Sequence, residues 1–286
     1  MLDSTLKSHI YQNTNIDIKG YTALSGGSIN NAAKVETQRG TCVLKWNAAS
    51  LFPMFEAEEK GLELLKENTV QFIIPEVFGS GKNGEYSWLL MNYIHEVRAG
   101  DACFTRFGES LAELHTKTQP DFGLDHDNFI GRLPQSNQKH NSWPEFFERE
   151  RIRPQLERAI ESGKIPKTYI KQAERLFHQL ASIFPDEPAC LLHGDLWSGN
   201  FISTDKNQTA LIDPAVYFGN REMELAFTKL FGGFGTAFYE AYHHHYPLQP
   251  GFEHRTEICN LYPLLVHVNL FGGGYISQVT SILKRF

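Results

Sequence analysis

The sequence has few cysteines, no long hydrophobic run and no excess of positive charge, and each absence excludes a class of protein. Its 286 residues include four cysteines, Cys42, Cys103, Cys190 and Cys259, and none of them forms a CxxC pair. Isolated thiols of this kind are typical of a reducing compartment, so we expect a cytoplasmic protein without a disulfide framework. No run of about 18 apolar residues is present, which excludes a membrane-spanning helix, and the N-terminal segment lacks the apolar stretch of a secretory signal.

The charge balance argues against nucleic acid as a partner. Lys and Arg number 27 and Asp and Glu number 33, which gives a formal net charge of −6. A nucleic-acid footprint needs a basic surface, whereas a small anionic ligand needs only a local basic pocket. With 41% hydrophobic and 21% charged residues, the composition is that of a folded globular protein. We expect a monomer that binds neither nucleic acid nor membrane.

The two parts of the chain differ in their predicted structure. Residues 1–93 are rich in strands, and only residues 54–67 have helical periodicity. The predicted strands are 21–25, 32–37, 41–46, 73–78 and 87–91, with a turn at 79–84. Residues 94–286 are mainly helical. The predicted helices are 104–114, 143–162, 170–183 and most of the chain from 222 onward, with a loop at 121–139 and short strands at 190–193, 201–203 and 210–212. The sequence therefore predicts an α+β fold of two lobes, a small β-rich N-lobe (1–93) and a larger helical C-lobe (94–286).

The run His193–Asn200, which reads HGDLWSGN, carries the strongest chemical signal. Asp195 and Asn200 are five residues apart, and Asp213 follows Asn200 by thirteen, after a short apolar strand. This spacing matches the catalytic loop and the metal-binding Asp of protein kinases. One carboxylate would accept the proton of a hydroxyl nucleophile, while an amide and a second carboxylate would hold Mg²⁺ on ATP. The alternative, a tight turn capped by Asp and Asn, does not account for Asp213.

Lys45 is the one charged residue of an apolar strand. On its own it would be assigned to the solvent-facing side, but the downstream loop places it where kinases keep the lysine that binds the α- and β-phosphates. Its partner should be an acid on the following helix. Glu58 shares a helix face with the apolar Leu62, whereas Glu56 and Glu59 are predicted to face solvent.

Two further segments could contact a nucleotide. Gly26, Gly27 and Ser28 stand between two strands and could cover phosphates, although Gly-Gly at such a place is more often a simple hairpin turn. Leu90–Ile94, which includes Met91, closes the N-lobe. In a kinase-like fold this is the hinge, and Asn92 and Ile94 would bind adenine through their backbone; the alternative is a strand running into a linker.

Taken together, these motifs resemble the fructosamine kinase (ketosamine-3-kinase) family, which lies within the protein-kinase-like and aminoglycoside-phosphotransferase group. The most specific segments are HGDLWSGN at 193–200, IDPAVY at 212–217 and LFGGF at 230–234. The resemblance implies a bilobal protein-kinase-like fold and ATP-dependent phosphorylation of O3 of a ketosamine, after which the adduct falls apart and frees the amine. It implies Asp195 as base, Asn200 and Asp213 on Mg²⁺, and Lys45 with Glu58 at the phosphates.

The sequence departs from the family pattern at two positions. Ser28 stands where some relatives have a redox-active Cys, and Glu224 stands where many have Asp. For the acceptor site, which could take a free or protein-bound ketosamine, the candidates are Trp197, His267, Asn269 and Asn128; Trp197 could equally be core packing. Two alternatives stay open: a kinase of another hydroxyl, such as an aminoglycoside or choline, and a nucleotide-binding pseudokinase.

Overall fold

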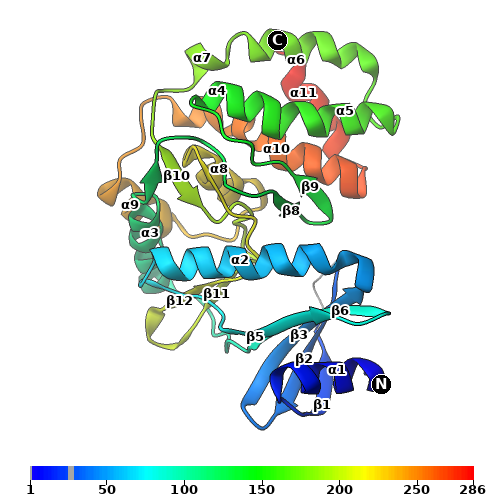
Figure 1. The fold of residues 1–286 in the computed structure, drawn as a ribbon. Coiled ribbons are helices and arrows are strands. Elements are labelled where there is room, and N and C mark those ends of the chain that lie inside the picture. Colours follow the sequence, from blue (N-terminus) through cyan, green and yellow to red (C-terminus); the bar gives the residue numbers. More distant parts are fainter. Residues whose placement is uncertain (1, 25–28) are drawn as a thin grey trace. The chain divides into compact units, whose positions relative to one another are not determined.

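The computed structural model describes residues 2–24 and 29–286, and the chain divides into two compact units. One unit comprises Met1–Ala99 with Phe201–Pro214, and the other comprises Gly100–Asn200 with Ala215–Phe286. The predicted α+β class is confirmed, with a β-rich first unit and a mainly helical second unit (Figure 1). The division differs from the predicted boundary at residue 93, because the first unit runs to Ala99 and includes 201–214.

The first unit is built on a five-stranded antiparallel sheet. Its strands lie in the order β1-β2-β3-β6-β5. The elements of the main sheet and its helices are α1 (Ser4–Thr14), β1 (Ile18–Ala23), β2 (Asn31–Thr37), β3 (Gly40–Ala48), α2 (Phe52–Asn68), β5 (Val77–Lys82) and β6 (Tyr86–Asn92). The sequence prediction omitted α1, whose N-cap Asp3 accepts hydrogen bonds from Thr5 and Leu6.

The two faces of this sheet are covered by different helices. Leu44 of β3 and Trp88 of β6 belong to the core cluster that also holds Leu6 of α1. Leu89 of β6 belongs to a second cluster with Phe55 of α2. Because side chains alternate between the faces of a strand, Lys45, which follows Leu44 and pairs with Leu89, faces α2.

A short hairpin explains why residues 201–214 belong to the first unit. β11 (Phe201–Ser203) and β12 (Thr209–Leu211) are antiparallel, and β12 pairs in parallel with β4 (Phe72–Ile73). The linker joins the same unit, since the Val97 amide donates to the Ser203 carbonyl. This hairpin carries the chain to Asp213.

The second unit is mainly helical, and two small sheets lie within it. The three-stranded sheet has the order β13-β10-β7, and β8 pairs with β9. Its strands are β7 (Thr118–Gln119), β8 (Asn128–Ile130), β9 (Leu133–Gln135), β10 (Ala189–Leu192) and β13 (Tyr217–Gly219). Its helices are α3 (Asp101–Leu114), α4 (Trp143–Phe146), α5 (Arg153–Glu161), α6 (Ile170–Phe177), α7 (Leu180–Ile183), α8 (Glu222–Phe231), α9 (Thr236–His245), α10 (Phe252–Phe271) and α11 (Tyr275–Leu283), with a π-helical segment at Phe147–Ile152.

Two predictions for this unit are corrected. The predicted loop 121–139 contains the β8–β9 hairpin, and the predicted helix 170–183 is divided into α6 and α7 at His178 and Gln179. Among the described residues, none of the helices has the length and apolar character needed to cross a membrane.

Helices α8 and α10 pack side by side and run in the same direction. Glu222 at the start of α8 accepts two hydrogen bonds from Arg255 in the first turn of α10. Near their other ends, the rings of Phe231 and His267 lie 5.0 Å apart. Both C-termini therefore lie at the same end of the pair.

Candidate functional site

In the first unit, Lys45 lies between two carboxylates. Its Nζ donates to Glu58 Oε1 at 2.6 Å and also to Oδ1 of Asp213. The structure thus contains the Lys45–Glu58 pair expected from helix periodicity. The two other acids considered as partners of Lys45 lie elsewhere: Glu59 accepts a hydrogen bond from Ser80, and Glu56 faces solvent.

Burial and charge act against each other on this lysine. Burial on its own would lower the pKa of Lys45, but Asp213 and Glu58 outweigh it and hold the pKa above its ordinary value. Lys45 is therefore a fixed cation at neutral pH. An ammonium group has three N–H donors, and two of them are taken by the carboxylates, so the third can reach an anionic oxygen.

Asp213 is held in an uncommon backbone conformation. Its φ is +55°, in the left-handed region that non-glycine residues seldom adopt. Its side chain is 44% exposed, unlike the buried Lys45 and Glu58. An exposed carboxylate of this kind suits a hard cation with oxygen ligands.

The predicted hinge is only partly available to a ligand. The Met91 side chain is buried with Phe55, Leu62 and Leu89 on the α2 face of the sheet. The Asn92 amide donates to the Glu76 carbonyl at 3.0 Å, while the Asn92 side chain accepts from the Glu76 amide at 2.6 Å. Asn92 can therefore offer adenine its main-chain carbonyl but not its amide. The predicted phosphate loop, Gly26, Gly27 and Ser28, lies outside the described residues.

In the second unit, Asn200 is hydrogen-bonded to Asp195. The Asn200 side-chain nitrogen donates to the main-chain oxygen of Asp195 at 2.8 Å and to Oδ2 of its carboxylate at 3.0 Å. The amide nitrogen is therefore used within the loop, and Oδ1 of Asn200 is directed away from these contacts. An amide oxygen is a suitable Mg²⁺ ligand.

A buried carboxylate on α8 fixes the backbone that precedes Asp195. Glu224 accepts from the amides of Gly194 at 2.8 Å and His193 at 3.2 Å. Gly194 has φ +84°, and a Cβ there would lie 2.0 Å from the Ala215 carbonyl oxygen. Only glycine fits at this position, which accounts for the glycine in the HGD run.

Sequence reasoning missed the residues that hold Glu224. His115 Nε2 lies 3.0 Å from Glu224 Oε2, and its Nδ1 lies 2.7 Å from the Tyr242 hydroxyl. Burial on its own would raise the pKa of Glu224, but the hydrogen bond from His115 and the neighbouring amides hold that pKa below its ordinary value. Glu224 therefore stays ionised beneath the loop, and no local sequence pattern pointed to His115.

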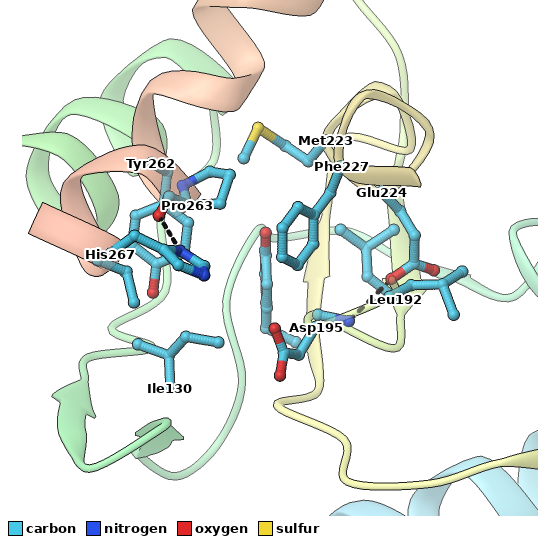
Figure 2. A pocket seen from close by; sticks show the side chains of 13 residues that line it. Ile130, Leu192, Asp195, Met223, Glu224, Phe227, Tyr262, Pro263 and His267 are labelled. Carbon is cyan, nitrogen blue, oxygen red and sulfur yellow. Dashed lines mark hydrogen bonds between the residues drawn. The ribbon is translucent and has the colours of Figure 1, made fainter. Parts of the chain in front are cut away.

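A pocket opens beside Asp195 within the second unit. Figure 2 shows α8 and α10 contributing its opposite walls, with Asp195 at its edge. Most of its lining is apolar. The lining includes Ile130, Leu192, Leu196, Met223, Phe227, Pro263 and Val266, with Asp195, Tyr217, Glu224, Tyr262 and His267 as the polar members.

His267 brings a hydrogen-bond acceptor into this pocket. Its Nδ1 lies 2.7 Å from the Pro263 carbonyl oxygen, so Nδ1 must carry the proton. Burial lowers the pKa of His267 below its ordinary value. The ring is therefore neutral at pH 7, and its Nε2 has a free lone pair.

The other predicted acceptor residues lie elsewhere. Asn128 donates to the Val216 carbonyl and accepts from Gln135, and Asn269 donates twice to Gln155. Neither lines the pocket, so scaffold roles replace their predicted substrate roles. Trp197 does not line it either, but its ring is 37% exposed and contacts Phe231.

Comparisons with known proteins give a consistent result. The sequence profile described as Fructosamine kinase matches residues 2–286. A probable ketoamine kinase of Vibrio parahaemolyticus is 38% identical over 92% of this chain and 90% of its own length. The chloroplastic protein-ribulosamine 3-kinase of Oryza sativa subsp. indica is 36% identical over 94% of this chain and 79% of its own.

Solved structures agree with these sequence matches. One assigned to a fructosamine-3-kinase of Haemophilus somnus 129PT superposes with a TM-score of 0.88 at 29% identity, covering 98% of this chain and 96% of its own. An aminoglycoside phosphotransferase has a TM-score of 0.66 at 16% identity, covering 99% and 98%. The second likeness shows the shared protein-kinase-like fold alone.

Proposed function

We propose that this chain, which belongs to the fructosamine kinase family, transfers the γ-phosphoryl group of ATP to O3 of a ketosamine. The single observation that carries the proposal is the pocket beside Asp195, where a carboxylate in the kinase loop motif lines an open, mostly apolar pocket. Relatives named ketoamine kinase and protein-ribulosamine 3-kinase support the acceptor class.

In the first unit, Lys45 would bind the phosphates of ATP through its third N–H, while Glu58 holds its ammonium group in place. The Asn92 carbonyl and the Ile94 amide would bind the adenine edge. The role of Gly26, Gly27 and Ser28 in covering the phosphates stays a prediction.

On the chemistry of their side chains, Asn200 and Asp213 are the proposed magnesium ligands. Asn200 Oδ1 and the exposed Asp213 carboxylate would each supply an oxygen, and the remaining positions would belong to phosphate oxygens and water. When bound, Mg²⁺ would neutralise charge on the phosphates.

In the second unit, Asp195 would orient the substrate hydroxyl and accept its proton as O3 attacks the γ-phosphorus. Nε2 of His267 would accept a hydrogen bond from another substrate donor across the pocket. Once O3 is phosphorylated, the enamine tautomer at C1–C2 can expel phosphate from C3. Hydrolysis then releases the amine, which is the repair of a glycated amine.

The two alternative functions, a kinase of another hydroxyl and a pseudokinase, fit the structure less well. Aminoglycosides carry several ammonium groups, and a pocket for them needs several free carboxylates. Of the two acids that line this pocket, Glu224 is already committed to backbone amides and His115. A pseudokinase would lack one of the catalytic groups, whereas Lys45, Asp195, Asn200 and Asp213 are all present.

The test is ADP release by the purified protein over fructosamines, ribulosamines, an aminoglycoside and choline. We expect turnover with ketosamines only, and turnover with the aminoglycoside or choline alone would overturn the proposal. We further propose that the protein is cytoplasmic and monomeric; buried cysteines suit a reducing compartment.

A further inference from the structure

An exposed aromatic cluster lies at the end of α8 and α10. It consists of Trp197, Phe231, His267, Phe271 and Tyr275. The ring centroids lie 6.3 Å apart for Trp197–Phe231, 5.0 Å for Phe231–His267, 5.6 Å for His267–Phe271 and 4.9 Å for His267–Tyr275. Because His267 also lines the pocket beside Asp195, the cluster continues that pocket outward.

The exposure of these rings is not explained by the fold. Trp197 is 37% exposed, Phe231 38% and Phe271 54%. Contiguous apolar side chains left in water at the mouth of a pocket mark a binding surface.

The backbone around the cluster favours positive charge. α8 ends at Phe231 and α10 ends at Phe271, and the two helices run in the same direction, so two helix C-termini meet the same aromatic cluster. A helix C-terminus carries partial negative charge on its unpaired carbonyls. One cation already contacts the C-terminal end of α10, since Lys164 donates to the Asn269 carbonyl at 2.6 Å.

Aromatic faces attract cations in the same way. The ring quadrupole is negative on its face, and an alkylammonium group over a Trp, Tyr or Phe ring is bound more tightly than a neutral group of the same shape. The nearby Lys229 does not occupy this role, because its ammonium group is paired with Glu253 and lies near the rings of Tyr239 and Phe252.

We propose that this aromatic cluster binds the protonated amine of the ketosamine and the first methylenes of the alkyl arm that carries it. The inference rests on the proposed function, because O3 must lie at Asp195. The amine is attached at C1, two carbons from C3, so an acceptor with O3 at Asp195 can direct its ammonium toward the cluster, because His267 lines the same pocket as Asp195. The arm then leaves over exposed side chains, which suits an amine that belongs to a lysine of a peptide or protein.

The experiment compares two substrates that differ in the atom attached to C1, which is a protonated amine in one and a neutral ether oxygen in the other. One is 1-deoxy-1-(butylamino)-D-fructose, whose amine is protonated at pH 7, and the other is its neutral ether, 1-O-butyl-D-fructose. For the wild type we expect kcat/KM to favour the amine by about 3- to 30-fold, with the difference in KM.

Two variants test whether the cluster causes this preference. Phe231→Leu and Phe271→Leu keep apolar volume but remove the aromatic face, and each should reduce the preference by about threefold through KM for the amine. Neither should alter kinetics with the ether. Tyr11→Leu, at an equally exposed ring of α1 in the first unit, should leave the preference unchanged.

The outcomes separate this inference from the proposed function. If both compounds are phosphorylated equally well, or if the preference persists in both folded variants, the ketosamine kinase stands and the cation site is overturned. If neither compound is phosphorylated by the wild type, the proposed function itself fails and this inference fails with it. Melting temperatures of the variants check that they are folded.

Discussion

The amide of Gly194 donates to Oε1 of Glu224 at 2.8 Å, so a buried carboxylate on α8 holds the backbone directly before Asp195. His115, which directly follows the C-terminal end of α3, contacts the other oxygen of the same carboxylate. The position of the proposed base is thus set by the hydrophobic packing of the second unit and by one ionised side chain.

Removal of the negative charge from Glu224 should weaken both folding and turnover. Glu224→Gln keeps the shape of the side chain. Its NH₂ group, however, would face one of the groups that now donate a hydrogen bond to the carboxylate. We expect a loss of about 1–3 kcal/mol in the free energy of unfolding, together with a lower kcat. Denaturant unfolding and steady-state kinetics measure the two effects. As a control, Glu253→Gln, which affects an exposed pair with Lys229, should stay within about 0.5 kcal/mol of wild type.

The same variant predicts a pH dependence of stability. The folded-state pKa of Glu224 lies below its ordinary value, so its contribution is fully present above that ordinary value and is lost as pH falls through the lowered one. The difference in unfolding free energy between wild type and Glu224→Gln should therefore be constant at neutral pH and shrink in acid. A difference that grows on acidification would contradict an ionised Glu224.

Lys45 and Glu58 should behave as one unit. Lys45→Ala removes the group proposed to bind phosphate, and Glu58→Ala removes the carboxylate that holds the Lys45 ammonium group in place. The double variant should therefore be little worse in kcat/KM than the worse single one. Glu56→Ala, on the same helix but exposed, is the matched control and should resemble wild type. Fully additive losses would show that Glu58 does not act through Lys45.

The Lys45–Glu58 pair was predictable because it depends on one local period and one motif. The 3.6-residue repeat put Glu58 on the face of Leu62, whereas the strand pattern alone favoured a solvent-facing Lys45, and only the match of the downstream loop to kinases placed Lys45 at the phosphates. The roles of Asp195, Asn200 and Asp213, inferred from their spacing, stay predictions. Each of these signals lies within a short stretch of sequence.

Other features depend on partners distant in sequence. The glycines of β5 suggested a turn, yet a Cβ at Gly81 would lie 2.9 Å from the indole of Trp88 on the neighbouring strand, so the glycines make room for that ring. Asn128 and Asn269 looked like acceptor residues because their backbone and side-chain partners cannot be inferred from sequence. His115 was missed for the same reason.

Mild oxidants should leave the activity unchanged. All four cysteines are buried, and burial raises the pKa of Cys42, the thiol nearest to Lys45 in the chain. We expect equal kcat with and without reductant, and no reaction of the native protein with a thiol reagent. A several-fold activation by reductant that Cys42→Ser abolishes would contradict this prediction.

The enzyme should also be competent without phosphorylation. After Asp213 the chain enters β13 within a few residues, where Tyr217 pairs with Leu192, and α8 begins at Glu222. This segment has no length for an activation loop, so phosphatase treatment should not change kcat. A several-fold loss after treatment would show that a modification orders the site.

The central claim is that Asp195 accepts the proton of a ketosamine hydroxyl, and turnover of Asp195→Asn with 1-deoxy-1-(butylamino)-D-fructose tests it most directly. The variant should fold and bind ATP with Mg²⁺ like wild type, measured by calorimetry, because Asn200 and Asp213 are the proposed metal ligands. Its kcat should fall by about 10²–10⁴-fold. A variant that kept more than about a tenth of wild-type kcat would contradict the assignment of Asp195 as the base.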